Sequence, residues 1–523
     1  MAFTIAHWML LTIATVSTLF GVVFLTIIIH RLSWHPLHRV PGPKLAAVSN
    51  VWHAYHARNG RMMSLGRTLH EKYGPVVRVG PNEVWLNSKD AFSRIYSATQ
   101  GFEKSSFYIA LALNRPELTS TLSLCFPDTL DLLGEFDLER YRLQRRLIGP
   151  IYHKRNLLKY EETIDAVMTG VVEHLRALSG TEVDLKEWMH IITVECLSAI
   201  VLSWSPGYLR AGTDFGSSGH SYLGWRRKSV FGLFPAAEIM DNYSRSLGRL
   251  FAKVWGLTFT PPAKFKPFFP AVGNKCMRRI NAALRSNPPN DKRRDLAYEL
   301  IELHKSRPEF KSTYLKRMVM TNFGAGHETT TSTLIGVLSM LGSHAEAQDQ
   351  VRDEVLQQEY VKGDGYANAC TLTYTEACIK EAQRLHPVIG MSLSRTVPAC
   401  GMEIDGFYFP PGTTVGCSPV ALHQNSDIFG PNAKDYRPNR WRQGDHAKIM
   451  DRYNLIWGGG ARTCPGRALA ELIVQRVVST LIKEFYIQVS IPAEEDMPMY
   501  FMAMLTGVKA CFRARDAKPP RHD

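Results

Sequence analysis

The stretch that decides the fold of this chain is Trp457-Gly458-Gly459-Gly460-Ala461-Arg462-Thr463-Cys464-Pro465-Gly466. Its three consecutive glycines allow backbone angles that are closed to other residues, so the chain can turn tightly around Cys464. The sequence after it predicts a helix from Arg467, whose N-terminal amides and dipole would stabilise a thiolate. A lone cysteine in a glycine-rich loop is more often inert, so the loop acquires a chemical meaning only if other residues need a thiolate.

The composition limits the classes of protein that this chain can belong to. With 523 residues, of which 45% are hydrophobic and 21% charged, it can bury a large core in one or two domains. Its nine cysteines contain no CxxC pair, which favours a reducing compartment over a disulfide frame or a zinc site. The net charge of +14 is dispersed without a basic and aromatic repeat, so we expect no nucleic acid but an anionic membrane or an acidic protein partner.

The N-terminal region predicts a membrane anchor. Residues 8–29 carry no charge, and about 20 residues of helix cross the hydrocarbon core of a bilayer. A signal peptide is disfavoured, because the apolar stretch is too long, no basic segment precedes it and no small-x-small cleavage site follows it. Basic residues follow directly, which places the body of the protein in the cytosol. We therefore divide the chain into a lumenal N-terminus (1–7), a transmembrane anchor (8–29), a hinge (30–45) and a catalytic domain (46–523).

The segment after the anchor predicts a rigid connection and a small sheet. Residues 35–43 contain Pro36, Pro41 and Pro43, which exclude helix and stiffen the chain. Residues 76–86 predict two short strands joined at Gly80-Pro81-Asn82. The hinge would hold the body at a fixed attitude to the bilayer, although a plain polar linker differs from it only in stiffness.

An arginine-rich helix is predicted over residues 138–152, where Pro150 stops it. Tyr141 and Arg145 are four residues apart and share a face. Without an anionic ligand, a solvated basic face is the better interpretation. The middle of the chain, residues 157–316, predicts mainly helix, and its apolar segments 231–235 and 265–270 predict loops at a pocket mouth or bilayer surface, or plain packing.

A long helix is predicted over residues 318–341, with glycines and threonines concentrated at residues 324–331. Both residue types weaken helix, and threonine hydroxyls compete for carbonyls one turn back, so we expect the helix to open locally. Glu328 and Thr329 offer an acid and a hydroxyl for relaying protons. Taken alone, this pattern also suits an ordinary core helix.

Two further groups of residues complete the pattern. Glu381 and Arg384 are three residues apart on one helix face, where a carboxylate and a guanidinium can pair, and Arg440 can join them. If buried, this group would specify the fold rather than act in catalysis. Arg395 precedes residues 401–413, whose alternation predicts a pair of strands.

The ordered motifs closely resemble those of the cytochrome P450 haem-thiolate monooxygenases. They are Ala325-Gly326-His327-Glu328-Thr329, Glu381-x-x-Arg384, Pro438-Asn439-Arg440-Trp441 and Gly460-x-Arg462-x-Cys464-x-Gly466. The resemblance extends from Pro41 to the end of the chain, and the anchor and hinge are similar to those of fungal microsomal members, including those of secondary metabolism. It implies a mainly α fold with small β-sheets (α+β), with one N-terminal transmembrane helix.

The resemblance also implies a haem b cofactor and a role for each motif residue. Cys464 would be the axial ligand of the haem iron, and Trp457 would shield its sulfur. The haem propionates would be bound by Arg145, Arg395, Arg462 and Tyr141. Ala325 and Gly326 would leave room for oxygen, Glu328 and Thr329 would deliver protons, and Glu381, Arg384 and Arg440 would form a buried structural triad.

Substrate-facing positions and departures from the family pattern follow by the same resemblance. The positions are Phe107, Tyr108, Asn322, Phe323, residues 389–392 and residues 502–505. Trp457 and Trp441 stand where phenylalanine is usual, and Asn439 where glutamate is frequent. These departures remove no ligand but alter the surroundings of the site.

The predicted function is oxidation of a lipophilic small molecule by O2 and NADPH-derived electrons at the endoplasmic reticulum membrane. The partners would be NADPH-cytochrome P450 reductase and cytochrome b5, and the pathway would be secondary metabolism of a polyketide, terpenoid or alkaloid. Three alternatives stay open: a haem-thiolate isomerase or dehydratase, a xenobiotic-detoxifying oxidase, and a non-catalytic haem-binding sensor.

Overall fold

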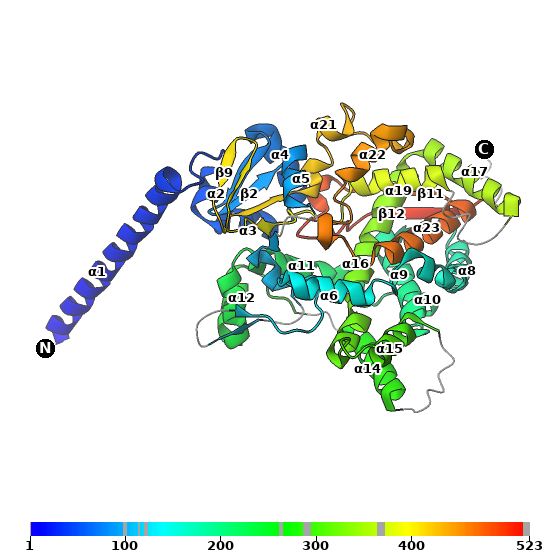
Figure 1. Ribbon diagram of the computed structural model, residues 1–523, viewed down its shortest axis with the longest axis horizontal. Helices are drawn as coiled ribbons and strands as arrows, with labels where there is room; N and C mark the ends of the chain where they lie inside the picture. Colours follow the sequence, from blue (N-terminus) through cyan, green and yellow to red (C-terminus); the bar gives the residue numbers. More distant parts are fainter. Residues whose placement is uncertain are drawn as a thin grey trace.

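The structure is a computed structural model that describes residues 2–97, 102–112, 116–119, 124–260, 265–285, 294–362 and 372–515. Helices dominate the described residues (Figure 1). They are α1 (Ala2–Ile29), α2 (Lys44–Val48), α3 (Asn50–Arg58), α4 (Met62–Tyr73), α5 (Lys89–Ile95), α6 (Leu138–Ile148), α7 (Lys154–Leu157), α8 (Glu161–Ala177), α9 (Leu185–Leu202), α10 (Tyr208–Ala211), α11 (Ser217–Gly232), α12 (Pro235–Tyr243), α13 (Arg245–Val254), α14 (Phe268–Arg285), α15 (Leu296–Ser306), α16 (Ser312–Ser343), α17 (Ala345–Lys362), α19 (Thr373–Leu385), α20 (Pro419–Leu422), α21 (Ser426–Phe429), α22 (Gly444–Arg452) and α23 (Arg467–Glu484).

The strands are short and form small sheets, as the sequence predicts. One sheet has the order β1-β2-β10-β7-β3, a second has the order β11-β12-β6, and β4-β5 and β8-β9 are hairpins. Their bounds are β1 (Val76–Gly80), β2 (Glu83–Leu86), β3 (Glu103–Lys104), β4 (Glu117–Leu118), β5 (Leu124–Cys125), β6 (Glu182–Asp184), β7 (Arg395–Thr396), β8 (Met402–Ile404), β9 (Phe407–Phe409), β10 (Thr414–Cys417), β11 (Phe485–Ser490) and β12 (Lys509–Ala514). The predicted antiparallel pair at residues 76–86 is β1 with β2, and the pair at residues 401–413 is β8 with β9.

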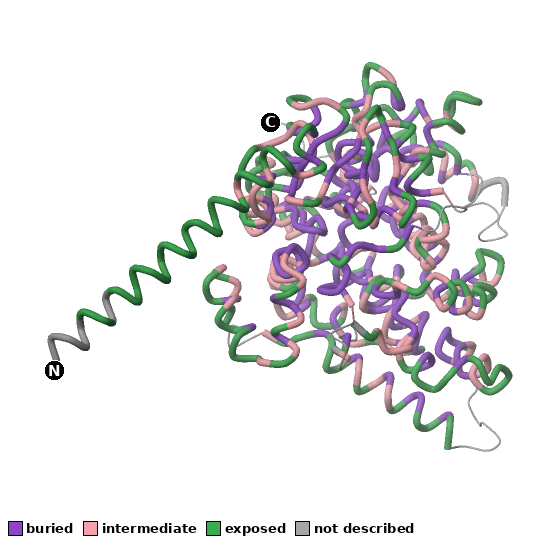
Figure 2. Tube along the Cα trace, turned by 60° about the vertical axis from the view of Figure 1, so that its left-hand side comes forward, coloured by how far each residue is buried: buried purple, intermediate pink, exposed green. Residues whose placement is uncertain are grey.

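Helix α1 projects from the body as an isolated rod (Figure 1), and nearly all of its described residues are exposed (Figure 2). The apolar span Leu11–Trp34 has a mean hydropathy of 2.3, and none of it is buried by the rest of the protein. An apolar helix without protein partners needs a hydrocarbon environment. The structure therefore contains one N-terminal helix suited to a membrane anchor.

The hinge is docked on the body through the buried side chain of Arg78 in β1. The Arg78 guanidinium donates hydrogen bonds to the carbonyls of Arg31 at 2.9 Å, Leu37 at 3.3 Å and Pro81 at 2.7 Å. Leu37 itself is fully buried. Residues 35–43 contain no helix, as their prolines predict, whereas the preceding residues 30–34 form one π-helical turn. These contacts explain how a short segment can fix the direction of α1.

The core is built around α16, which packs along α9 (Figure 1). The helix runs without interruption from Ser312 to Ser343, so the predicted opening at residues 324–331 is wrong. The threonine hydroxyls do bond one turn back, since Thr329 donates to the Ala325 carbonyl at 2.6 Å and Thr331 to that of His327 at 2.7 Å. These carbonyls keep their helical geometry and accept the hydroxyl as a second donor, so the helix stays closed.

Candidate functional site

The cysteine loop turns tightly before α23. The Cys464 amide donates to the Trp457 carbonyl at 2.8 Å and thereby closes the loop. Gly460 has a φ of +61°, and a Cβ atom there would lie 2.3 Å from the Tyr96 carbonyl oxygen. Only glycine fits such a position, because a side chain would meet both backbone strain and a steric clash. The predicted need for glycine before Cys464 is therefore met by a specific contact.

The Cys464 thiol faces a space inside the protein. Its side chain is exposed, although the surrounding chain removes it from bulk solvent. Burial raises the pKa of this thiol above its ordinary value, while the Gly466 amide and the guanidinium groups of Arg145 and Arg467 act to lower it. The predicted amide effect is thus present, but burial outweighs it. A stable thiolate here requires a bound cation, which is what a metal ligand has.

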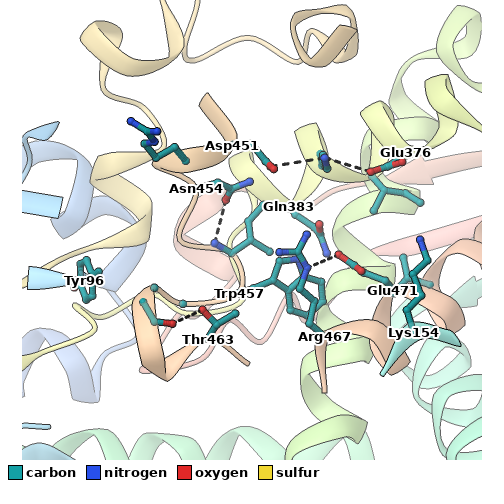
Figure 3. A pocket seen from close by; sticks show the side chains of 18 of the residues that line it. Tyr96, Lys154, Glu376, Gln383, Asp451, Asn454, Trp457, Thr463, Arg467 and Glu471 are labelled. Atoms are coloured by element: carbon teal, nitrogen blue, oxygen red, sulfur yellow. Dashed lines mark hydrogen bonds and ion pairs between the residues drawn. The ribbon is translucent and has the colours of Figure 1, made fainter. Parts of the chain in front are cut away.

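Trp457 lies at the edge of a cavity of about 340 Å³ beside the cysteine loop (Figure 3). Its ring centre is 5.9 Å from the guanidinium carbon of Arg467. Nε of Arg467 also donates a hydrogen bond to the Glu471 carboxylate at 2.7 Å. The indole is therefore held against the first turn of α23 by a cation–π contact. Its predicted role as a shield for the Cys464 sulfur stays a prediction.

A group of cations gathers beside the thiol from four separate elements. Arg145 comes from α6, Arg395 from β7 and Arg462 from the turn before Cys464, as the sequence predicts, and Lys104 comes from β3. The guanidinium of Arg462 lies 4.0 Å from the centre of the Tyr141 ring, and burial together with Arg395 lowers its pKa to about 10. Burial, Arg395 and Arg462 likewise lower the pKa of Lys104 well below its ordinary value. Such repulsion among buried cations is relieved by an anion.

The unpartnered atoms of this group show which anion fits. Nη1 of Arg145 and Nε of Arg462 are buried N–H donors without a hydrogen-bond partner among the residues that the structure describes. The nearby carboxylate of Glu135 is already engaged by Arg140 at 2.6 Å and 2.7 Å. Two free donors beside a thiol fit a group that carries both carboxylates and a metal, which is the donor pattern of a haem with its propionates. Lys104 was not predicted, because a two-residue strand gives no sequence signal.

The open face of α16 is formed by Ala325 and Thr329. Ala325 is exposed although it lies in the middle of a largely buried helix, and Thr329, one turn later, is half-buried on the same face. Gly326 points elsewhere, because a Cβ atom there would lie 3.2 Å from Leu197 of α9. Gly326 therefore allows α9 to pack closely on α16. The predicted role of Gly326, to leave room for oxygen over the haem iron, stays a prediction.

Glu328 points away from Thr329 and into the contact between α16 and α9. Its carboxylate is 2% exposed, lies 3.6 Å from Nε2 of His327, and has no hydrogen-bond partner on either oxygen within the described part of the chain. Thr329 instead holds its hydroxyl against the Ala325 carbonyl. The predicted acid and hydroxyl are adjacent in sequence, but the structure turns them to different faces of the helix.

The predicted triad of Glu381, Arg384 and Arg440 is present and buried. Arg384 donates to both carboxylate oxygens of Glu381 at 2.8 Å and 2.9 Å, and Arg440 donates to one of them at 2.8 Å. The Trp441 indole donates to the other oxygen at 2.8 Å, which gives this departure from the usual phenylalanine a structural use. Burial alone would raise the pKa of Glu381, but the bonds and charges of Arg384 and Arg440 hold it below its ordinary value.

The predicted substrate-facing positions divide into two groups. Phe107 lies with its ring centre 5.4 Å from Phe501, which also stacks on Trp225 at 6.0 Å, and residues 389 and 502 pair as an isolated bridge. Phe107, Trp225 and Phe501 form an aromatic cluster. Asn322 accepts a hydrogen bond from the Tyr152 hydroxyl at 2.7 Å, and Phe323 is fully buried; Phe107 and Met502 of the first group are buried as well.

The fold and the site together define a class of protein. A thiol facing an internal space, unpartnered guanidinium donors beside it and a helix face left open at Ala325 fit a haem-thiolate protein. The sequence comparisons reach the same class independently.

Residues 40–510 match the cytochrome P450 family. The chain is 54% identical to cytochrome P450 monooxygenase sdnT of Sordaria araneosa over 95% of this chain and 94% of that protein. It is 28% identical to cytochrome P450 monooxygenase hepC of Aspergillus oryzae over 91% of this chain and 92% of the relative, and 25% identical to pisatin demethylase of Fusarium vanettenii over 91% of each. The chain belongs to the cytochrome P450 family. This confirms the predicted fold class, the haem-thiolate cofactor and the monooxygenase function.

Proposed function

We propose that this monooxygenase hydroxylates or otherwise oxidises a lipophilic small molecule, with O2 as oxidant and NADPH as the source of electrons. The observation that carries the proposal is the Cys464 thiol beside the buried guanidinium groups of Arg145 and Arg462, whose N–H donors without a partner among the described residues fit a haem. When bound, the haem activates oxygen for insertion into a C–H bond. The similarity to fungal monooxygenases supports a secondary metabolite of polyketide, terpenoid or alkaloid type as the substrate.

The chain's own residues have distinct roles in this proposal. Cys464 would hold the iron through its sulfur, Arg145, Arg395 and Arg462 would neutralise the propionates, and Tyr141 would donate a hydrogen bond to them. Ala325 keeps the open face of α16 clear, and the Thr329 hydroxyl, held at 2.6 Å from the Ala325 carbonyl, can pass a proton along that face. Glu328 supplies protons to this region only after its side chain turns, since it faces α9.

The redox partner is proposed to be a membrane-bound NADPH-cytochrome P450 reductase, with cytochrome b5 as a second donor. The cavity beside the cysteine loop supports this (Figure 3), because four basic residues, Lys154, Lys380, Arg452 and Arg467, line it against three acidic ones, Glu376, Asp451 and Glu471. Basic side chains near the thiolate loop attract an acidic electron donor. Residues 1–7 would be lumenal, residues 8–29 would span the endoplasmic reticulum membrane, residues 30–45 would form the hinge and residues 46–523 the cytosolic catalytic domain.

The proposal is tested by oxygen- and NADPH-dependent product formation with a reductase and a panel of lipophilic pathway intermediates. We expect Thr329→Ala to lower the rate of product formation by about 100-fold or more, because a positioned proton donor contributes roughly 10²–10⁴-fold. Thr329→Ser should restore most of it, and Thr331→Ala, which removes a buried hydroxyl with the same back-bond, should not lower it. Turnover that consumes no oxygen and is unchanged in Thr329→Ala would contradict the proposal and favour an isomerase or dehydratase.

A further inference from the structure

A second cluster of ligand-type side chains lies between α9 and α16, away from Cys464. It consists of His190 of α9 and His327 and Glu328 of α16, whose ligand atoms all lie within 4.8 Å of one another. All three residues are buried. Buried histidines and carboxylates require partners, and Glu328 has no hydrogen-bond partner on either oxygen.

The two histidines are oriented as metal ligands are. Nδ1 of His327 lies 2.7 Å from the Phe323 carbonyl oxygen, and Nδ1 of His190 lies 3.0 Å from Oδ2 of Asp214 in an ion-pair contact without hydrogen-bond geometry. An acceptor at Nδ1 fixes the proton there and leaves the lone pair of Nε2 for a metal. Nε2 of His190 has no hydrogen-bond partner, and Nε2 of His327 faces Glu328 at 3.6 Å. The Phe323 carbonyl thus orients the His327 ring, and the Asp214 carboxylate lies beside the His190 ring.

The charges of the cluster also favour a cation. Glu328 and Asp214 bring two carboxylates into a region where they are 2% and 1% exposed. Lys186, one turn before His190 on α9, is the cation that faces them, but its ammonium is buried without a hydrogen bond to either. The ammonium of Lys228, on α11, is a second nearby cation and acts to lower the pKa of His327. Among the described residues neither ammonium forms a hydrogen bond with the Glu328 carboxylate, so this charge has no direct partner.

We propose that His190, His327 and Glu328 bind a divalent transition-metal ion such as Zn²⁺, with Asp214 and the Phe323 carbonyl as the outer shell. Two imidazoles and one carboxylate are ligands that zinc accepts, with a water as the fourth. Donor atoms around tetrahedral zinc are roughly 3.3 Å apart, given bonds of about 2.0–2.1 Å. The present 3.6 Å between His327 and Glu328 needs only a small side-chain rotation.

Occupancy of this site has a consequence that rests on the proposed function. The metal engages the carboxylate of Glu328, the residue before Thr329, and so prevents that carboxylate from supplying protons to the open face of α16. Zinc therefore acts as an inhibitor of oxygen-dependent turnover. The binding itself does not depend on turnover and can be measured without it.

The test uses the full-length, haem-loaded protein, because bound haem keeps Cys464 from the added metal. The protein is stripped with a chelator and dialysed against Zn²⁺, and zinc and haem are counted in the same sample. We expect one zinc per chain in the wild type. Asp214→Asn should weaken the zinc affinity 10-fold to 100-fold, as loss of an outer-shell partner does, and His190→Ala should abolish binding. His446→Ala, which changes an exposed histidine of α22, should leave the stoichiometry unchanged.

X-ray absorption at the zinc edge should show nitrogen and oxygen ligands without sulfur. Lys186→Met, which removes the competing ammonium, should tighten binding. Equal zinc in the wild type and in haem-replete His190→Ala, or no zinc in the wild type, would overturn the site. The haem count separates these outcomes from a failure of the proposed monooxygenase function, which would show as absent turnover in metal-free protein.

Discussion

At the scale of single residues, the carboxylate of Glu381 illustrates how strongly one buried charge depends on its partners. It accepts hydrogen bonds from Arg384, Arg440, Trp441 and the Arg437 amide, all between 2.8 Å and 2.9 Å. Removing one guanidinium leaves a buried charge whose desolvation is no longer offset. The sequence spacing predicts this group well, because both its residue types and its three-residue separation are specific.

We therefore expect Arg384→Leu to lower the free energy of unfolding by about 3–5 kcal/mol and to release haem. The control is Lys448→Met, which breaks an ion pair whose side chains are 81% and 90% exposed and should cost under about 1 kcal/mol. Denaturant unfolding and the haem content of the purified protein measure both. Equal unfolding midpoints for the two variants would show that the triad is not a structural element.

Gly460 gives a second residue-scale prediction. Because its φ is +61° and a Cβ atom would meet the Tyr96 carbonyl oxygen, Gly460→Ala should destabilise the protein by roughly 1–3 kcal/mol and weaken haem retention. Gly224→Ala is the matched control, since Gly224 lies in helix α11 with no atom within 4 Å of the added Cβ. That change should stabilise by about 0.5–1 kcal/mol. Thermal unfolding and haem titration of both variants decide between these expectations.

Residue type and order were enough to predict Cys464, the arginines and the triad, but not the direction of each side chain. Ala325 and Thr329 share one face of α16 because they are four residues apart. Glu328 precedes Thr329 by one residue, so its side chain leaves the helix on another face, where its carboxylate lies 3.6 Å from Nε2 of His327. Gly326, one residue after Ala325, is turned off this face in the other direction and lies against Leu197. Lys104 escaped prediction, since two residues of strand have no periodicity.

At the scale of elements, α16 shows tertiary packing overriding helix propensity. Its glycines and threonines predict an opening, yet the helix is continuous because α9 packs along it and each threonine hydroxyl finds a carbonyl within the helix. Propensity alone could not reveal this, because the helix stability comes from neighbours that the local sequence does not contain.

The hinge supplies the element-scale prediction. Arg78 is 2% exposed and donates to the carbonyls of Arg31 and Leu37 in the hinge and of Pro81 in the β1–β2 turn. Arg78→Met should therefore free residues 30–43 and increase their rate of proteolysis about 10-fold. This factor is equivalent to the roughly 1.5 kcal/mol of a charged hydrogen bond. Arg142→Met, which changes an exposed residue of α6, is the control. Limited proteolysis of the membrane-bound protein provides the measurement. Unchanged cleavage in Arg78→Met would mean that the prolines alone hold the hinge.

At the scale of the whole molecule, two buried histidines predict loss of stability in acid. Burial and Arg67 lower the pKa of His386 to about 4, and burial and Arg384 lower that of His423 to about 3, from an ordinary 6.5. Between these values the unfolded chain binds protons that the folded protein does not. The stability is therefore complete above about pH 6.5 and falls as the pH drops towards 4, by roughly 3 kcal/mol or more for each group.

Thermal unfolding between pH 7 and pH 5 measures this effect. His386→Asn should make the stability less dependent on pH, whereas His446→Gln, at an exposed position, should leave the dependence unchanged. A melting temperature that is constant over this range in the wild type would contradict the assignment of neutral buried histidines.

The architecture as a whole was predictable only in part. The apolar anchor and the order of the four motifs indicate a membrane-anchored, mainly helical protein, and the family match confirms its fold. The five-stranded sheet was not predictable, because it pairs β2 with β10, more than 300 residues later, and uses two-residue strands. Such pairing depends on packing that brings distant segments together.

The central claim is that Cys464 holds the haem iron through a thiolate, and the carbonyl complex of the reduced protein tests it most directly. With a thiolate ligand, this complex absorbs near about 450 nm. The wild-type protein should show this band, and Cys464→His should lose it while retaining haem. A band that persists in Cys464→His, or that is absent from the haem-loaded wild type, would contradict the account.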